Sequence, residues 1–396
     1  MSSPTNEHRA MESACIYLAL FFATFSFATS SSQFPSHLIN VFALKDLDLV
    51  ALDPKILSCV AESKCIEVRV SPSLQVGTFL NSSSEVETRF KAHFGNDRTW
   101  SIEVLSPDTA VIKKLFGKIY AKQLVVSVIQ RSPAQNYWKV AGEERLDVLE
   151  RAFDKFDPID QKLVRVPKDI DRFLLWWRNG RFVSCDRELA KKFPSNDSII
   201  TAEHIANLKM FTTELLGTGQ VPSLAAGTLL GWFRNCGVIP YTTDIDIWIK
   251  VDEFQEDFMN SLKDRSDFRL LRRIGDNEYA REMTVKIPGS VKDTYADVFY
   301  RYKHNSTFEW IGITYGKDSG WQRLRNLIPT IDELCTGDLL GELFFVACNY
   351  IEVLETSYGK TDWKEPQENY FYTGHDRLVF ADGNWNKTLD DVIIHY

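Results

Sequence analysis

The sequence has no excess of positive charge, no Cys-x-x-Cys pair, no internal repeat and no low-complexity segment. Lysine and arginine together number 46, against 54 aspartates and glutamates, which gives a formal net charge of −8. A chain without a basic field or long basic runs lacks the electrostatic footprint of a nucleic-acid-binding protein. The missing Cys-x-x-Cys pair removes the usual signature of a structural zinc site. We therefore expect neither a nucleic-acid partner nor a structural zinc ion.

Charge is also missing from Ser13 to Leu44, a stretch without Asp, Glu, Lys or Arg. Its part at residues 14–28 is almost wholly apolar, which is typical of a membrane-targeting element. The length of this largely apolar stretch, 15 residues, lies between that of a signal-peptide core and that of a full membrane span. The sequence is thus compatible with a cleaved signal peptide, with a cleavage zone at Ala28 to Ser30, or with an uncleaved anchor.

The glycosylation sequons and the cysteines predict that the rest of the chain is secreted or lies in the lumen of the secretory pathway. Four Asn-x-Ser/Thr sequons are present: Asn81, Asn196, Asn305 and Asn386. Of the seven cysteines, Cys15 lies in the apolar segment, and Cys59 and Cys65 are near enough in sequence to close a small loop. Six remaining cysteines allow about fifteen pairings, and buried free thiols are a further alternative.

The length of 396 residues, with 44% hydrophobic and 13% aromatic content, predicts two or three well-packed domains. Residues 38 to about 156 alternate strand-like runs, such as 65–70 and 124–129, with helical patterns such as 143–156, which predicts an α/β domain. This region contains no catalytic constellation, so we interpret it as a stem. The predicted domains are a tail with a membrane segment, a stem and a catalytic domain, over residues 1–33, 34–165 and 166–396.

The catalytic domain is predicted to be a mixed sheet with flanking helices, an α/β (α+β) architecture. Residues 201–216 form an amphipathic helix pattern that Gly217 ends, and 252–262 a second helix. Asn349 with Glu352 predicts a capping box for the last helix, which ends at Gly359. Strand-like runs occupy residues 268–274, 283–287, 295–302 and 308–315.

Two carboxylates alternate with isoleucines in the run Asp244-Ile245-Asp246-Ile247. Because side chains of a strand alternate between faces, Asp244 and Asp246 share one face, roughly 7 Å apart, while the isoleucines anchor the other. Two carboxylates this close repel one another unless a cation lies between them. A hard divalent cation with open positions for phosphate oxygens meets this need, so the run predicts a Mg²⁺ or Mn²⁺ site.

A glycine-hydroxyl turn precedes this strand at Gly227 and Thr228. Thr228 is predicted to cap a short helix that Gly237 ends, with free backbone N–H groups facing an anion. Arg234, on the same helix, offers a charged fork to a donor phosphate, and a structural salt bridge is its alternative role.

A third acid, Asp297, lies in a later apolar strand, Tyr295 to Tyr300. Glycine with a hydroxyl, then Asp-x-Asp, then Asp on a later strand is the order found in the nucleotidyltransferase superfamily. The runs GTLLGWFR, CGVIPYTTDIDI and ADVFY resemble the LicD-type phosphotransferases, and within them the fukutin family. The tail is similar to that family too, at 349–360, Trp363, 382–385 and 391–396. The resemblance covers roughly residues 170–396.

The resemblance implies an enzyme that uses a CDP-activated alcohol as donor and a glycan of a glycoprotein as acceptor. By resemblance the transferred group is ribitol 5-phosphate, although a related family transfers phosphocholine from a similar donor. One of the three aspartates would act as the base. The resemblance also implies a single-pass type II membrane protein of the Golgi, with the endoplasmic reticulum as an alternative location. It favours an uncleaved anchor over a cleaved signal peptide.

Further residues are assigned to substrate binding. Tyr358, Gly359 and Trp363 are expected in the wall of the donor pocket, where the alternative for the two aromatics is the hydrophobic core. Arg323 and Arg325 are expected to bind an acceptor phosphate. The alternative function, from another class, is a non-catalytic scaffold for sister Golgi transferases. The expected partners are then these transferases or further copies of the same chain.

Overall fold

A computed structural model describes most of the chain and divides it into two compact units. The described residues are 38, 41–42, 44–62, 65–116, 119–131, 134–140, 145–146, 165–167, 169–196, 198–317, 320–367, 378–386 and 388–396. The apolar segment 14–28 lies outside the described residues. The structure therefore does not distinguish a signal peptide from an anchor. Within the described ranges, no helix is long and apolar enough to cross a membrane. The units comprise 1–130, 139–142 and 148–174, and 131–138, 143–147 and 175–396.

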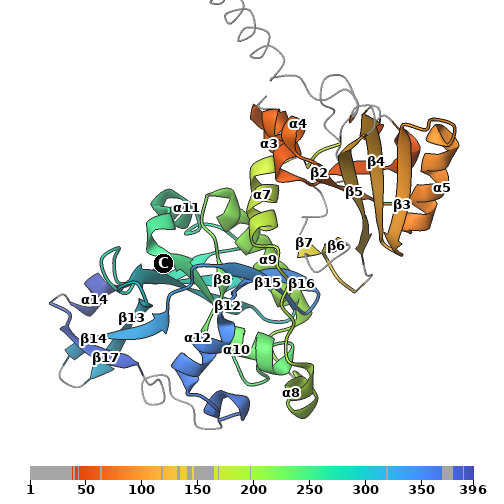
Figure 1. Cartoon of the computed structure of the whole chain (residues 1–396). Coiled ribbons are helices and arrows are strands. Elements are labelled where there is room, and N and C mark those ends of the chain that lie inside the picture. The colour runs from red at the N-terminus through yellow and green to blue at the C-terminus, as the bar shows by residue number, and fades with distance from the viewer. Residues whose placement is uncertain are drawn as a thin grey trace, which may run out of the picture. The chain divides into compact units, whose positions relative to one another are not determined.

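The first unit is built on a sheet with the strand order β1-β2-β5-β4-β3. Its strands are β1 (Leu49–Ala51), β2 (Ser73–Thr78), β3 (Trp100–Ser106), β4 (Thr109–Phe116) and β5 (Ile119–Arg131). Its helices are η1 (Lys45–Leu47), α3 (Pro54–Glu62), α4 (Ile66–Val70) and α5 (Ser83–Phe94). Helix α5 packs against β3 and β4 (Figure 1). The strand predicted at 124–129 is confirmed within β5, where Leu124, Val126 and Val128 are buried.

One prediction for this region is wrong, and another lies almost wholly outside the described residues. Residues 65–70 were expected as a strand, but 66–70 form α4. The Cys59–Cys65 disulfide ties the start of this segment to α3, with 4.4 Å between the two Cα atoms, and α4 packs against α3. Of the helix expected at 143–156, only Arg145–Leu146 are described, and these two residues form the short strand β7 instead of helix; the rest lies outside the described residues. Strand β6 (Trp138–Val140) and helix α7 (Ile170–Arg178) complete the elements near the unit boundary.

The second unit contains a mixed sheet, as predicted, and nine strands form it in the part of the chain that the structure describes. Its main order is β17-β14-β13-β12-β11-β10-β18, while β9 pairs in parallel with β12, and β8 pairs with β9. The strands are β8 (Ser223–Leu224), β9 (Asp244–Lys250), β10 (Leu270–Ile274), β11 (Glu282–Ile287), β12 (Thr294–Lys303), β13 (Phe308–Lys317), β14 (Gly320–Pro329), β17 (Val379–Asn384) and β18 (Ile393–His395). A separate hairpin joins β15 (Leu334–Leu339) to β16 (Glu342–Ala347).

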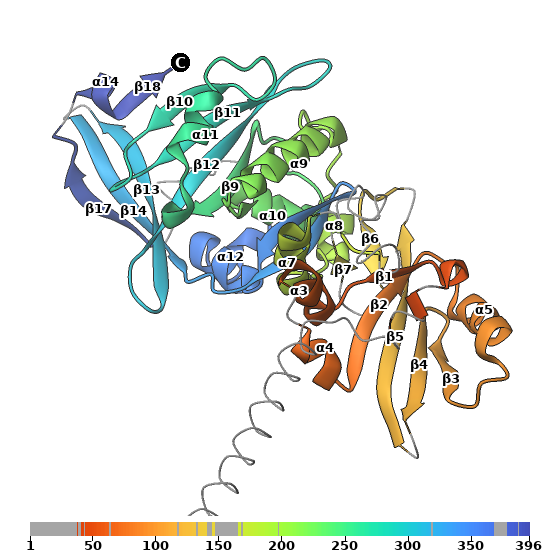
Figure 2. The same cartoon turned by 90° about the horizontal axis from the view of Figure 1, so that it is seen from above.

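Helices flank this sheet, with α9 and α10 near β9 (Figure 2). They are α8 (Arg187–Lys192), α9 (Ala202–Gly217), α10 (Ala226–Asn235), η2 (Val251–Glu253), α11 (Glu256–Ser261), α12 (Tyr350–Tyr358), η3 (Asp362–Lys364) and α14 (Leu389–Val392). The helix predicted at 201–216 is confirmed as α9. The helix predicted at 252–262 is interrupted, because Phe254 is extended where its ring packs on Tyr300 at 5.2 Å between centroids.

The last predicted helix is confirmed as α12, which ends at Gly359 with a φ of 88°, a backbone angle that glycine adopts without strain. Its capping box is wrong, since the Asn349 side chain donates to the Thr330 carbonyl and to the Glu352 carboxylate instead of accepting from the helix backbone. Asn349 therefore links the helix to the strand end at Thr330.

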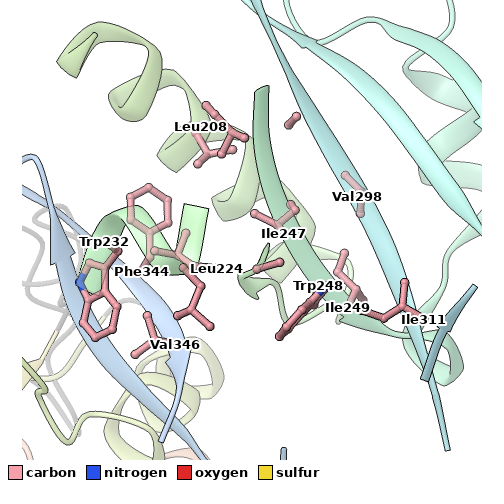
Figure 3. Packing of buried hydrophobic residues seen from close by; sticks show 14 of the residues in the cluster. Leu208, Leu224, Trp232, Ile247, Trp248, Ile249, Val298, Ile311, Phe344 and Val346 are labelled. Carbon is pink, nitrogen blue, oxygen red and sulfur yellow. The ribbon is translucent and has the colours of Figure 1, made fainter. Parts of the chain in front are cut away.

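One hydrophobic core lies around β9 and joins the sheet to its helices. Ile245, Ile247 and Ile249 are fully buried. Figure 3 shows Leu208 from α9, Trp232 from α10 and Phe344 from β16 in the same cluster. The isoleucines of the Asp-x-Asp run thus anchor β9, as expected.

All six cysteines outside the apolar segment form disulfides. Besides Cys59–Cys65, the pairs are Cys185–Cys236 and Cys335–Cys348. The first of these ties the loop before α8 to the end of α10, and the second joins the open ends of β15 and β16. The free-thiol alternative is therefore wrong for these residues.

Candidate functional site

The start of α10 and the middle of β9 are clasped by three hydrogen bonds. The backbone N–H of Gly227 donates to Asp246 Oδ2 at 3.1 Å, and the backbone N–H of Asp246 donates to Thr228 Oγ1 at 2.8 Å. The N–H of Ala225 donates to the Asp246 carbonyl at 3.0 Å. A Cβ atom at Gly227 would lie 3.4 Å from Asp246 Oδ2, which shows how closely this carboxylate approaches the start of the helix. This clasp fixes the position of the Asp246 carboxylate.

The predicted role of Thr228 as a helix cap is wrong, and so is the predicted end at Gly237. Ala225 is the N-cap of α10, and Cys236, in a left-handed conformation, is its C-cap. Thr228 lies inside the first turn, where its hydroxyl oxygen accepts a hydrogen bond from β9. The anion that the helix N-terminus faces is thus a side chain of this chain, Asp246.

The structure brings together the three predicted acids. Asp297 on β12 lies directly opposite Asp246 on the parallel strand β9, and Asp244 precedes Asp246 by two residues on the same face. One carboxylate oxygen from each residue lies within 4.8 Å of the others. We call this side of the sheet the front face. Three carboxylates at this spacing could hold a metal ion.

The environment of this cluster opposes negative charge. Burial raises the pKa of Asp246 well above its usual range, and the neighbouring Asp244 and Asp297 raise it further, while backbone N–H groups of Gly227 and Thr228 counteract part of the effect. Burial likewise raises the pKa of Asp297, against the hydrogen bond from Thr284 and the charge of Arg272. A bound cation would remove the repulsion that both shifts report.

Three further polar residues surround Asp297, and sequence reasoning missed all of them. Thr284 Oγ1 donates to Asp297 Oδ1 at 2.6 Å. Arg272 Nη2 lies 3.0 Å from Glu282 Oε1 and 3.8 Å from Asp297 Oδ1. Burial, and next the charge of Asp297, raise the pKa of Glu282 to about 8. No short motif contains these residues, since only the pairing of β10 with β11 and of β11 with β12 aligns them with Asp297.

A cavity of about 1120 Å³ opens over the front face, and the three aspartates lie in its wall. One side is formed by α10, α12 and the segment that follows α12, with Arg234, Tyr358 and Trp363 among the lining residues. Sheet residues form the other lining group, among them Trp248 and Asn326. This volume is slightly above the roughly 300–1,000 Å³ typical of small-molecule sites, so the cavity has room for a ligand larger than a typical drug-sized molecule.

The residues assigned to the donor pocket line this cavity or lie next to it. Arg234 is 2% exposed, its Nη1 donates to the Trp363 carbonyl at 3.0 Å, and its burial lowers its pKa. Trp363 is 3% exposed and packs on Phe233, so this side chain belongs to the core and to the cavity wall at once. Gly359 turns the chain between Tyr358 and this tryptophan.

Arg323 and Arg325, which were expected to bind an acceptor phosphate, do not lie in the wall of the cavity. In the register of β13 and β14, Asn326 faces the cavity side opposite Ile311, so the adjacent Arg325 points to the other side of the sheet, the back face. Arg325 Nε donates to Asp382 Oδ2 at 2.7 Å, and its guanidinium lies 4.3 Å from the Trp310 ring centroid. Arg323 stacks on Tyr279 at 4.7 Å. Neither arginine lines the cavity.

The four sequon asparagines are all exposed. Asn81 precedes α5, Asn196 follows α8, Asn305 lies in the turn between β12 and β13, and Asn386 follows β17. Each is therefore accessible in the folded units to modification, which needs an exposed amide.

Comparison with known proteins agrees with the geometry of this site. Residues 222–330, which include all three aspartates, match the family described as LicD/FKTN/FKRP, nucleotidyltransferase domain. A Caenorhabditis elegans protein, the uncharacterized T07A5.1, is 30% identical over 234 residues, which are 56% of this chain and 60% of that protein. The human and mouse proteins named ribitol-5-phosphate transferase FKTN are 28% and 27% identical, over 60% and 58% of this chain.

The chain matches only part of each relative, 51% of the human and 50% of the mouse transferase. The matched region contains the clasp between α10 and β9 and the aspartates of β9 and β12. The resemblance seen in the sequence is confirmed: residues 222–330 match the LicD/FKTN/FKRP nucleotidyltransferase domain, and the chain is similar to ribitol-5-phosphate transferases of the fukutin family over about 60% of its length.

Proposed function

We propose that the protein transfers a phosphorylated alcohol, ribitol 5-phosphate, from a CDP-activated donor to a hydroxyl group of a glycan on a glycoprotein. The observation that carries the proposal is the convergence of Asp244, Asp246 and Asp297 in the wall of a ligand-sized cavity. The mouse and human relatives are named ribitol-5-phosphate transferase, which supports the choice of the transferred group.

The three carboxylates fit Mg²⁺ or Mn²⁺, because they offer hard oxygen ligands and because burial and mutual repulsion make their uncompensated charge unfavourable. When bound, such a cation would neutralise charge on the donor phosphates. The clasp at Gly227 holds Asp246, and the Thr284 hydroxyl holds Asp297, so the ligands are fixed before any donor arrives.

In the proposed reaction, the oxygen of the acceptor hydroxyl attacks the phosphorus that carries the alcohol. The bond from this phosphorus to the CMP oxygen breaks, CMP leaves, and the hydroxyl proton passes to one of the carboxylates of the cavity. Arg234, with Tyr358 and Trp363, is proposed to bind the nucleotide end of the donor. Its guanidinium is already held by the Trp363 carbonyl, which reduces the entropy lost on binding phosphate.

We further propose that the body of the protein lies in the lumen of the secretory pathway, anchored in the Golgi membrane with type II topology. Three disulfides support an oxidising compartment, and four exposed sequons support access to the glycosylation machinery. Expression in cultured cells followed by endoglycosidase digestion tests this placement. A shift in electrophoretic mobility that Asn→Gln changes at the four sequons abolish is expected, whereas an unchanged mobility would contradict it.

The decisive experiment incubates the purified chain with Mn²⁺, a phosphorylated glycan acceptor and either CDP-ribitol or CDP-choline, and follows the acceptor mass. We expect addition of ribitol phosphate and a loss of at least about 100-fold on Asp246→Asn, because the reaction loses a preorganised electrostatic contact. Asp382→Asn, a carboxylate on the back face, is the matched control and should retain the activity. Addition of phosphocholine would change the proposed donor, and no transfer from either donor would overturn the proposal.

A further inference from the structure

The front face continues beyond the aspartates into an apolar floor. Trp248 follows Asp246 by two residues on β9 and lies opposite Phe299 on β12. Ile311 on β13 and Asn326 on β14 are paired further across the same face. All four residues line the cavity. We call the surface formed by these four residues the sheet floor. Since β12 and β13 separate β9 from β14, its two ends, Trp248 and Asn326, lie about three strand spacings apart, roughly 14 Å.

Two polar atoms of the sheet floor are buried without a hydrogen-bond partner among the described residues. Trp248 is 3% exposed, and its indole N–H meets no acceptor. At the other end, Asn326 Oδ1 meets no donor. Buried polar groups are nearly always paired in folded proteins, so an unpaired donor and an unpaired acceptor in the wall of one cavity point to a ligand or to bound water.

The surroundings select a neutral ligand. Arg272 and Arg301 are the arginines aligned with this floor by strand register, and each forms an ion pair, with Glu282 and Glu309. Among the described residues, neither of these two arginines is therefore left over to bind a phosphate at the sheet floor. An indole N–H requires an acceptor and an amide oxygen requires a donor, and hydroxyl groups provide both. Apolar rings and aliphatic side chains between the two ends fit the C–H faces of sugar units.

We infer that the sheet floor is the acceptor subsite, in which Trp248 and Asn326 hydrogen-bond hydroxyl groups of a neutral oligosaccharide segment. This inference rests on the proposed function for its assignment to the acceptor. In an in-line transfer, the attacking hydroxyl and the leaving nucleotide lie on opposite sides of the phosphorus. A glycan on the sheet floor therefore leaves the side formed by α10 and α12 to the nucleotide. The roughly 14 Å span suits a chain of sugar units better than one small alcohol.

The test compares Trp248→Phe, which removes the N–H and keeps an aromatic ring, with Asn326→Leu, which removes the amide at similar size. We expect the acceptor KM to rise about tenfold in each, the loss of one hydrogen bond, with the donor KM unchanged. Trp385→Phe is the matched control, because its indole N–H is also buried and unpaired but lies outside the cavity lining. Melting temperatures of all three variants identify any general loss of folding.

Binding measurements separate this inference from the proposed function. Full-length protein with Mn²⁺ and CMP is titrated with a panel of neutral and phosphorylated disaccharides, and binding is followed by ligand-observed NMR. Binding that both variants weaken, without any transfer activity, would support the subsite and overturn the proposed function. Transfer with an unchanged acceptor KM in both variants would overturn the subsite and leave the function standing. A rise in the donor KM alone would assign the sheet floor to the donor and overturn the inference.

Discussion

The two faces of the nine-stranded sheet carry charged clusters with opposite electrostatic character. On the front face, Asp246 and Asp297 lie opposite one another, and burial with mutual repulsion raises the pKa of both carboxyls. On the back face, Arg325 pairs with Asp382 at 2.7 Å and stacks over Trp310. The back-face charges are compensated within the chain. Those of the front face are compensated only in part, by Arg272 and by hydrogen bonds.

This difference distinguishes a structural cluster from a binding site. A compensated pair contributes to folding, modestly where it is partly exposed to water. A group of like charges opposes folding, and a ligand that neutralises it gains the free energy otherwise spent on repulsion. The front face is therefore expected to respond to cations, pH and charge removal much more strongly than the back face.

The largest contrast is expected from matched carboxylate changes on the two faces. Asp297→Asn should reduce transfer at least about 100-fold while raising the melting temperature of the metal-free protein, since one of the repelling charges is removed. Asp382→Asn should leave kcat within about twofold and lower the melting temperature by roughly 2 °C, the loss of a partly exposed pair. Equal effects of the two changes on transfer would remove the distinction between the faces.

The second contrast is stabilisation by a divalent cation. Mn²⁺ at about 100 times its Kd should raise the free energy of unfolding by about 2.7 kcal/mol, or the melting temperature by roughly 5–10 °C. Asp244→Ala with Asp246→Ala should abolish this shift because two ligands are lost. Differential scanning fluorimetry measures it, and Asp382→Asn serves as the control that keeps the shift. A wild-type protein indifferent to Mn²⁺ and Mg²⁺ would rule out the metal site.

A third contrast concerns pH in the absence of metal. The pKa of Glu282 is raised to about 8 from 4.5, so the folded state retains a proton that the unfolded state releases. Its contribution to stability is fully present below about pH 4.5 and is lost as the pH rises through about 8. Wild-type protein in EDTA should therefore lose stability relative to Glu282→Gln between these values. A constant difference in melting temperature across this range would contradict the raised pKa.

The smallest effect is expected at Arg325. Arg325→Lys keeps the charge but loses the planar stacking over Trp310, so the melting temperature should fall by about 1–3 °C with the KM of donor and acceptor unchanged. Steady-state kinetics with both substrates checks this. A rise of several-fold in the acceptor KM of a stably folded variant would instead support the phosphate-binding role that the sequence suggested for Arg325.

Local patterns of the sequence predicted the elements that do not depend on distant partners. The alternation in the Asp-x-Asp run predicted which side chains of β9 are buried, and the apolar spacing of 201–216 predicted α9. Where a distant contact intervenes, the local pattern was wrong. Residues 66–70 form a helix that packs against α3 directly after the Cys59–Cys65 disulfide. The Thr228 hydroxyl, which was expected to cap α10, instead accepts a hydrogen bond from the backbone N–H of Asp246.

By itself, the sequence determined that two aspartates share one face of a strand and that a third acid follows in another strand, because a period of two is a property of the backbone. Only the tertiary structure decided that Asp297 meets Asp246, that Thr284 and Arg272 surround it, and that Trp248 and Asn326 line the same cavity. These relations depend on which strands pair and in what register. Register follows from the packing of the whole sheet, and a one-residue shift would turn each of these side chains to the other face.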